Sequence, residues 1–490
     1  MPRTISLTVA SAFLLIIAFP QIEWWPLAWV ALVPFLIAIE GKSYKVFFVV
    51  SYLLGFLFFS GTLGWFVYVT YPGAFVLIAY LSLYVAVFGL AIRFFKNSSI
   101  FLRVLVLPCC WVVLEYIRSH ALSGFGWALL GSSQCKNTLL IQIADVTGVY
   151  GVSFLVVMVN VLIAGTINNT SKASIIRAQV LVFALLFASF VYGFFSIWKA
   201  PSWPKTLVAV VQPNIPQEVK WEQSLQPSIV GQTAEITMGL KDVHPDLIVW
   251  PETSLPGIIT EVPYLLGAIK LTAVKVHAPL LMGAITDEQG NYFNSAYLIN
   301  ENGKMAGRYD KIHLVPFGEF LPLRPILGWI NRFVPLEDFT AGTNYTILRT
   351  AAGHRFGVLI CFEDTVSYLR RQFTKAGAQF FVNMTNDAWF KDTKAPFIHL
   401  QAAIFGCIEN KRSLIRAANT GFSGMIDPFG RILASVSDEK HKNTFVPGRA
   451  VAEIPLVSTI TFYTKYGDVF TLGCFFAILW AVLRPKKENL

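Results

Sequence analysis

The chain has 490 residues, of which 55% are hydrophobic and only 14% are charged, and its mean hydropathy is +0.57. Soluble domains carry roughly 25% charged residues, so this composition excludes a cytosolic enzyme, a disordered chain and a fibrous repeat. The charges are unevenly spread, with 15 in the first 200 residues and 53 in the remaining 290. The first part is expected to be a membrane region and the second a globular domain, which also excludes a simple multi-span transporter.

Eight apolar runs approach the length of about 20 residues that crosses a bilayer as a helix. They lie near residues 4–20, 24–40, 46–70, 73–95, 100–117, 148–167, 178–198 and 467–484. The first run lacks a small-residue cleavage site and other spans follow it closely, so we interpret it as an anchor and not as a removed signal peptide. Residues 1–200 are therefore predicted to form transmembrane helices one to seven, and residues 467–490 the eighth helix and a cytoplasmic tail.

The distribution of Lys and Arg predicts how these spans are oriented, because cytoplasmic loops are enriched in both residues. If the N-terminus is inside, the cytoplasmic segments carry Arg3, Lys42, Lys45, Arg93, Lys96, Arg103, Lys172, Arg177, Arg484, Lys486 and Lys487. The outer loop between spans five and six carries only Arg118 and Lys136. Residues 205–455 are thus expected outside the cytoplasm. Topology and lipid headgroups explain the net charge of +10, and no nucleic-acid partner is expected.

The connection between spans five and six is apolar but rich in Gly and Ser, in the run Ser123-Gly-Phe-Gly-Trp127 and in Leu129-Leu-Gly-Ser-Ser133. One interpretation is an interfacial loop whose tryptophan anchors at headgroup level. The other is a loop that lines an opening toward lipid beneath the soluble domain. The sequence leaves both open.

From Thr206 onward, short apolar β-rich runs alternate with helical stretches. The runs are 206–212, 246–250, 280–283, 294–299, 356–360 and 380–383, and the helical stretches include 224–241, 262–276, 365–376 and 397–411. Several runs are continuously apolar, as expected of strands that are buried on both faces. This pattern predicts a layered α/β domain.

Three polar residues stand where buried strands end or in a polar loop of this domain. Glu252 follows Trp250-Pro251, Lys311 lies in a run that begins at Tyr309, and Cys361 directly follows an apolar strand. Taken singly, each has a structural explanation, since a strand-end Cys is usually a small core residue and a lone Glu or Lys is usually solvated. Together they make a candidate catalytic group.

The order Glu, Lys, Cys, with separations of 59 and 50 residues, resembles the nitrilase or carbon–nitrogen hydrolase superfamily. The matching segments are Val211-Gln-Pro-Asn-Ile-Pro216, Trp250-Pro-Glu-Thr253, Tyr309-Asp-Lys-Ile-His-Leu-Val-Pro-Phe-Gly-Glu319, Ile360-Cys-Phe-Glu363, Asn386-Asp-Ala-Trp-Phe390, Arg416-Ala-Ala-Asn-Thr-Gly421 and Ile426-Asp-Pro-Phe-Gly430. With eight spans around the domain, nearly the whole chain is similar to the bacterial apolipoprotein N-acyltransferases, the membrane-bound branch. The resemblance implies an αββα sandwich for residues 205–455.

The chemistry of the three residue types agrees with this resemblance. A thiol becomes a good nucleophile only after deprotonation, and a nearby base and cation both favour the thiolate. Glu252 would accept the proton of Cys361, and Lys311 would stabilise first the thiolate and then the tetrahedral oxyanion. The backbone N–H of Phe362 is a second candidate oxyanion donor. No histidine is needed as the base, so we interpret His313 and His399 as structural.

Further residues carry over from the resemblance alone. Glu319 and Glu363 match acids that support the lysine and the cysteine, although each could be a plain charge partner. Asn294 and Trp221 match residues around the acyl pocket, and Trp127 matches an aromatic residue of the membrane-domain loop. Their structural alternatives are a strand-end cap for the asparagine and packing for the tryptophans.

Two positions depart from the family pattern. Phe362 stands where a tyrosine is common, which removes any hydroxyl role there. The run Phe405-Gly-Cys-Ile-Glu409 lacks an arginine that often precedes the Ile-Glu pair, so a helix contact is expected to differ. Neither departure touches the three principal residues.

The resemblance implies a phospholipid-dependent N-acyltransferase of the bacterial inner membrane with its catalytic domain on the periplasmic side. An acyl chain of a glycerophospholipid, typically phosphatidylethanolamine, would form a thioester on Cys361 and then move to the α-amino group of a diacylglyceryl-cysteine, the final step of lipoprotein maturation. No cofactor is expected, because the chain has no Gly-rich phosphate loop with Gly-Lys-Ser/Thr and no His-Glu-x-x-His. Its six cysteines have neither zinc-site spacing nor the density of a disulfide framework.

Two other functions are consistent with parts of the sequence. A membrane-tethered amidase would use the same three residues to hydrolyse a small amide, but it leaves most spans unexplained. A transporter or scaffold would use the α/β domain only to bind a partner, and loss of Glu252, Lys311 or Cys361 would have favoured it. All three residues are present.

Overall fold

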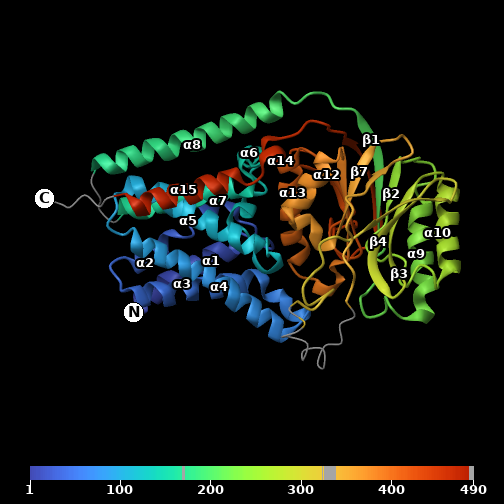
Figure 1. Cartoon of the computed structure of the whole chain (residues 1–490), viewed down its shortest axis with the longest axis horizontal. Coiled ribbons are helices and arrows are strands. Elements are labelled where there is room, and N and C mark those ends of the chain that lie inside the picture. Colours follow the sequence, from blue (N-terminus) through green and yellow to red (C-terminus); the bar gives the residue numbers. More distant parts are fainter. Residues whose placement is uncertain (168–171, 323, 325–337, 485–490) are drawn as a thin grey trace. The chain divides into compact units, whose positions relative to one another are not determined.

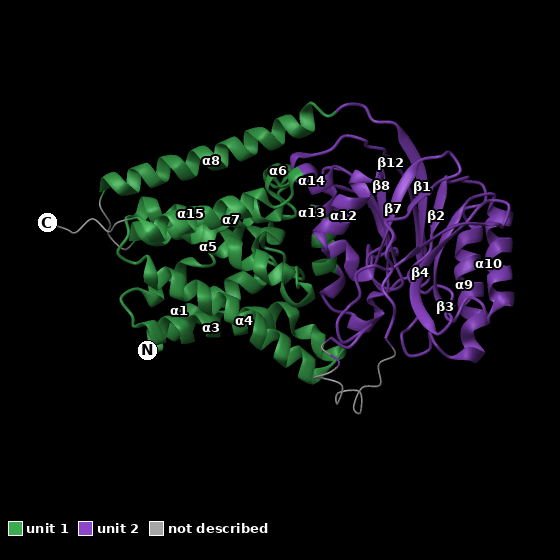
Figure 2. Ribbon diagram, in the orientation of Figure 1, with its two compact units in different colours: residues 1–200, 397–405, 466–490 green, residues 201–396, 406–465 purple. Residues whose placement is uncertain are grey.

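A computed structural model describes residues 1–167, 172–322, 324 and 338–484. The expected cytoplasmic tail, with Lys486 and Lys487, lies outside these residues. The chain forms two compact units, coloured separately in Figure 2. Unit 1 comprises residues 1–200, 397–405 and 466–490, and unit 2 comprises residues 201–396 and 406–465.

Unit 1 is built from apolar helices. They are α1 (Pro2–Ile17), α2 (Val33–Ile39), α3 (Tyr44–Leu63), α4 (Tyr71–Phe94), α5 (Ile100–His120), α6 (Ala144–Thr147), α7 (Val149–Ile167), α8 (Lys172–Trp198) and α15 (Val469–Leu483), with short 3₁₀ turns between them. In the described part of the chain, five helical segments are long and apolar enough to cross a membrane: 44–68, 71–94, 100–123, 149–167 and 172–198. Three shorter apolar helical segments, 2–17, 25–39 and 469–483, coincide with the first, second and eighth predicted spans. The number of eight spans stays a prediction.

Small residues let neighbouring helices of unit 1 approach closely. A Cβ atom added to Gly55 of α3 would lie 3.0 Å from the Cα of Ser82 on α4, and one added to Gly89 of α4 would lie 1.9 Å from the Oγ of Ser51 on α3. Close backbone approach at small residues is the usual way in which membrane helices pack, because apolar burial distinguishes little between a helix and lipid.

Unit 2 contains two six-stranded sheets. The strands are β1 (Lys205–Gln212), β2 (Leu247–Val249), β3 (Leu280–Glu288), β4 (Asn291–Ile299), β5 (Met305–Asp310), β6 (Ile347–Arg349), β7 (Arg355–Ile360), β8 (Phe380–Thr385), β9 (Ser413–Ala418), β10 (Gly424–Ile426), β11 (Ile432–Ser435) and β12 (Gly448–Pro455). The first sheet has the order β12-β1-β2-β3-β4-β5 and the second β11-β10-β9-β8-β7-β6. Parallel pairs occupy both centres, β1-β2-β3 in the first sheet and β7-β8-β9 in the second. Five of these six central strands, β1, β2, β3, β7 and β8, coincide with apolar runs named in the sequence, whereas β9, which contains Arg416, does not.

Helices cover both sheets, as Figure 1 shows. Helices α9 (Gln226–Met238) and α10 (Pro263–Val276) pack on the first sheet, where Trp250, Ile248 and Ile269 are fully buried in one apolar core. Helix α12 (Ser367–Lys375) covers the second sheet, since the ring of Phe373 lies against Gly357 of β7. Helix α13 (Ala395–Asn410) and the short α14 (Phe462–Tyr466) complete the element order. The prediction of a multi-helix apolar region and a nitrilase-like α/β domain with two sheets is confirmed.

Candidate active site

Cys361 occupies a sharp turn at the end of a buried strand. It directly follows β7, and its φ of +54° lies in the left-handed region that residues with a side chain seldom adopt. The turn is held from below, because the Nδ2 of Asn383 on β8 donates to the carbonyl oxygen of Cys361 at 3.1 Å. Such strained strand-to-helix turns present a nucleophile at the edge of a sheet.

Glu252 lies at the end of the neighbouring sheet, three residues after β2. Its Oε1 accepts a hydrogen bond of 2.8 Å from the Nδ2 of Asn294 on β4. The chain around Glu252 runs so close to β3 that a Cβ atom on Gly283 would lie 2.4 Å from the backbone nitrogen of Thr253. Only glycine fits at position 283, and this close approach fixes where the carboxylate sits.

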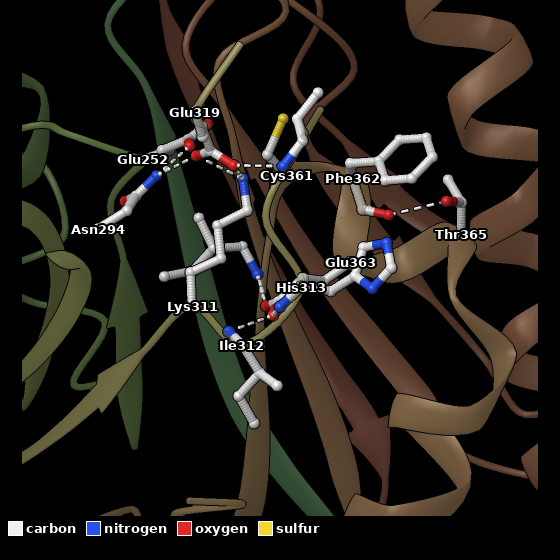
Figure 3. Close-up of polar contacts among 12 residues, drawn as sticks. Glu252, Asn294, Lys311, Ile312, His313, Glu319, Cys361, Phe362, Glu363 and Thr365 are labelled. Carbon is white, nitrogen blue, oxygen red and sulfur yellow. Dashed lines mark hydrogen bonds and ion pairs between the residues drawn. The ribbon is translucent and has the colours of Figure 1, made fainter. Parts of the chain in front are cut away.

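Lys311 follows β5 and is only 1% exposed. Its Nζ contacts both carboxylate oxygens of Glu319, at 2.8 Å each. Asn294 also donates to the Oε1 of Glu319 at 3.2 Å, so one amide joins the two carboxylates. In Figure 3 the Glu252, Asn294 and Glu319 side chains meet at the end of the Lys311 side chain, next to Cys361. The structure therefore brings the three predicted residues into one site.

Glu363 joins the lysine loop to the cysteine turn. Its carboxylate is fully buried and accepts hydrogen bonds from the backbone N–H groups of Ile312, His313 and Ile360 at 2.7 to 2.9 Å. The hydroxyl of Tyr309 donates to the same carboxylate at 2.9 Å. Because Ile312 and His313 follow Lys311 and Ile360 precedes Cys361, this one side chain bonds the backbone beside the lysine to the backbone beside the cysteine (Figure 3).

The charges of the site act on one another in a buried setting. Burial raises the pKa of the Cys361 thiol and Glu252 raises it further, whereas Lys311 and the Thr385 hydroxyl oppose the shift. Burial also raises the pKa of Glu252, against the opposing effect of Lys311. Burial alone would lower the pKa of Lys311, but Glu319, Cys361 and Glu252 together raise it above the ordinary value. The site thus places an ammonium group beside a thiol and a carboxyl group whose pKa values are both raised by burial.

A second buried network lies behind the cysteine turn. Arg416 on β9 is fully buried, and its guanidinium donates to Asp364 at 2.6 Å and to the Oδ1 of Asn383 at 2.7 Å. It also donates to Asp387 at 3.2 Å. Asn383 in turn holds the Cys361 carbonyl, so the arginine supports the strained turn through one intermediate.

The other predicted site residues are found in different surroundings. The Phe362 ring lies 6.1 Å from the His313 ring, centroid to centroid, in unit 2. Trp221 is 43% exposed. Trp127 belongs to unit 1, where it is buried against Trp65, with ring centroids 5.2 Å apart, and against His399 at 5.3 Å. Trp127 is therefore packed inside an aromatic cluster of unit 1.

Sequence reasoning missed several residues that support the site, among them Asn383, which donates to the Cys361 carbonyl oxygen. Tyr309 and Arg416 stand inside motifs that the sequence singles out, but neither motif reveals which neighbour they bond. Lys220 precedes Trp221 and is buried at 3% exposure, with its Nζ 3.1 Å from the carbonyl oxygen of Glu252. A lysine next to a predicted pocket residue is the only signal that could have indicated it. Among the residues that the structure describes, no group of three or more His, Cys, Asp or Glu side chains could hold a metal ion.

Comparisons with known proteins show to which family the chain belongs. Residues 11–162 match the family described as the apolipoprotein N-acyltransferase N-terminal domain, and residues 207–460 match the carbon–nitrogen hydrolase family. The chain is 35% identical to an apolipoprotein N-acyltransferase of Geobacter metallireducens, over 96% of this chain and 93% of that protein. It is 36% identical to one of Methylococcus capsulatus over 73% and 70% of the two chains, and 29% identical to one of Chlorobaculum tepidum over 96% and 94%. The chain belongs to the apolipoprotein N-acyltransferase family, within the carbon–nitrogen hydrolase superfamily.

Proposed function

We propose that the protein transfers an acyl chain from a glycerophospholipid to the α-amino group of the diacylglyceryl-cysteine of lipoproteins, through a thioester on Cys361. The observation that supports this most directly is the shared site of Glu252, Lys311 and Cys361, with Asn294 and Glu319 bonded into it. A nucleophile, a base and a fixed cation are what a ping-pong acyl transfer needs.

In the first half-reaction Glu252 accepts the Cys361 proton, and the thiolate attacks an ester carbonyl of the phospholipid. The oxyanion that forms would be stabilised by the Lys311 ammonium and by the backbone N–H of Phe362. When the tetrahedral intermediate collapses, the carbon–oxygen ester bond breaks and Glu252 returns its proton to the departing lysophospholipid. The enzyme is left with an acyl thioester and Glu252 is again a carboxylate.

In the second half-reaction the neutral α-amino group of the acceptor attacks the thioester carbonyl. Glu252 takes a proton from the attacking nitrogen, and Lys311 again faces the oxyanion. The carbon–sulfur bond breaks, the amide forms, and the proton on Glu252 returns to the Cys361 sulfur. No cofactor enters either half-reaction.

Both substrates in this proposal are membrane lipids, which accounts for an α/β domain joined to apolar helices in one chain. We propose phosphatidylethanolamine as the donor. We further propose that the helices lie in the bacterial inner membrane and that residues 205–455 face the periplasm, because the Lys and Arg residues gather on the opposite loops. In this proposal Asn294 and Trp221 lie around the acyl pocket, and Trp127 is a substrate-binding aromatic residue of the membrane-domain loop.

The test separates the two half-reactions. Purified protein is incubated with phospholipid that is radiolabelled in its acyl chain, without any acceptor, and lysophospholipid release and protein-bound label are measured. We expect label on the wild type and none on Cys361→Ala. A diacylglyceryl-cysteine peptide should then remove the label as an amide. Equal label on both proteins would remove Cys361 from the mechanism.

The amidase alternative is tested by the same samples. If the acyl group on Cys361 is hydrolysed rapidly in the absence of an amine acceptor, water is the natural second substrate. A label that persists for many turnover times and leaves only when the peptide is added favours the transferase.

A further inference from the structure

Lys220 is a buried ammonium group that the three-residue mechanism does not use. It lies in the segment between β1 and α9 and is 3% exposed, whereas the adjacent Trp221 is 43% exposed. Burying a charged lysine costs free energy unless the charge is compensated, so its position calls for a physical reason. Lysine is rarely found fully buried without a partner.

The structure places this ammonium at the candidate base. The Nζ of Lys220 donates to the backbone carbonyl oxygen of Glu252 at 3.1 Å. Lys220 and Glu252 both line one small hollow, together with Thr233, Ser254 and Asn419. The hydrogen bond therefore ties the segment before α9 to the turn that carries Glu252.

Lys220 also interacts electrostatically with the Glu252 carboxylate and the Cys361 thiol, the two groups that exchange the proton. Burial lowers the pKa of the Lys220 ammonium to about 8, and the carboxylate of Glu252 and the thiol of Cys361 both oppose that shift. Lys220 therefore carries its charge at pH 7. Burial raises the pKa of Glu252 and Glu319 raises it further, whereas Lys311, the Asn294 amide and Lys220 oppose that shift.

The two lysines have different partners. The ammonium of Lys311 is paired with both oxygens of Glu319, so much of its charge is already compensated. The described contacts of the Lys220 ammonium include no carboxylate, only the carbonyl oxygen of Glu252. Lys220 thus supplies positive charge that remains available to Glu252 and to the thiolate.

We propose that Lys220 is a positioning residue of this site, which fixes the Glu252 turn and favours the ionised form of Glu252, the base toward Cys361. The proposal rests on the function proposed above, since it assigns Lys220 a part in forming the thiolate. The proton still moves from the Cys361 sulfur to a Glu252 oxygen, and Lys220 neither gains nor loses one.

The experiment measures thiolate formation without any lipid. The purified full chain is alkylated with iodoacetamide between pH 5.5 and 9.5, and the rate at Cys361 is followed by mass analysis of its peptide. In Lys220→Met a neighbouring positive charge is lost, so the pH at which the alkylation rate of Cys361 begins to rise should be about one pH unit higher than in the wild type. The rate at pH 7 should then fall roughly tenfold, since one pKa unit is a factor of ten. Lys220→Arg keeps the charge and should stay within about threefold of the wild type.

Two further variants separate charge from structure. Lys241→Met makes the same chemical change at an exposed lysine and should leave the profile unchanged. Lys220→Gln keeps a hydrogen-bond donor but removes the charge, so it should behave like Lys220→Met. If thermal unfolding shows that Lys220→Met does not fold, the Lys220→Gln profile tests the proposal in its place.

The outcomes are distinct. A Lys220→Gln profile that matches the wild type would overturn the proposal, because hydrogen bonding alone would then suffice. An alkylation profile that shifts as expected in a protein that never forms an acyl adduct would support Lys220 and reject the acyltransfer mechanism. A fall in acyl loading with an unshifted alkylation profile would mean that Lys220 acts only on lipid binding.

Discussion

Replacing Arg416 by methionine tests whether the buried network behind Cys361 holds the nucleophile in place. Arg416, Asp364 and Asp387 are all fully buried, and the guanidinium contacts one carboxylate at 2.6 Å and the other at 3.2 Å. Arg416→Met keeps an apolar side chain of similar length but leaves two buried carboxylates without this partner. Removing one member of a buried ion pair costs about 3–5 kcal/mol.

That cost is a large part of the stability of an ordinary domain, which is about 5–15 kcal/mol. For a domain of this size, the loss should lower the unfolding temperature of unit 2 by roughly 10 °C. The assay is thermal unfolding in mild detergent, monitored by the fluorescence of Trp250, which is fully buried in unit 2. A Trp250→Phe protein serves as the reference, and its signal is subtracted to remove the contribution of the other tryptophans.

The matched control is a second substitution that removes one of the orphaned charges. Arg416→Met combined with Asp364→Asn should recover about 1 kcal/mol or more, because residues in one network couple energetically. The single variant should also slow Cys361 acylation, since Asn383 loses its contact with the guanidinium and holds the Cys361 carbonyl less firmly. An Arg416→Met protein that unfolds within 2 °C of the wild type, or a double variant less stable than the single one, would refute this reasoning.

Three further predictions concern Glu363, Lys311 and the membrane topology. Burial raises the pKa of Glu363 from its ordinary 4.5 to about 7. The protonated form of Glu363 therefore stabilises the fold fully below pH 4.5, and about 3 kcal/mol of stability is lost as the pH rises to 7. In Glu363→Gln the free energy of unfolding should lack this pH dependence, and a pH dependence equal to that of the wild type would contradict the prediction. Lys311→Arg should reduce acyl loading at least 100-fold although it keeps the charge, because a planar guanidinium does not fit the compact site beside Glu319, and near-normal loading would make Lys311 a general electrostatic neighbour. Reporter fusions after Lys205 and after Leu490 should report opposite compartments, and a shared compartment would reject the eight-span topology.

Much of the fold follows from apolar patterning. The strands at 206–212, 356–360 and 380–383 were predictable because strands at a sheet centre are buried on both faces and read as continuous apolar runs. Strands β5, β6, β9, β10, β11 and β12 were not predicted. Only Ala450 and Ile454 of β12 are buried, and its partner β1 lies more than 200 residues away in the sequence, so no local signal marks it.

In the candidate site, too, some residues could be predicted from the sequence and others could not. Glu252, Lys311 and Cys361 could be singled out because reactive residue types stand at strand ends within recognisable motifs. Their support could not, since a sequence holds no distances: nothing in it links Asn383 to the Cys361 carbonyl or Tyr309 to Glu363. Lys220 was missed for a further reason. A lysine in a polar turn is normally solvated, and only the fold shows that this one is buried at Glu252.

The central claim is that Cys361 carries the acyl group, and mass analysis of the protein tests it most directly. After incubation with phosphatidylethanolamine alone, the peptide that contains Cys361 should gain the mass of one acyl chain less one hydrogen, and neutral hydroxylamine should remove the added mass, as expected of a thioester. Lysophospholipid should appear in equal amount. An unmodified Cys361 peptide alongside released lysophospholipid, or an adduct on any other residue, would contradict the account.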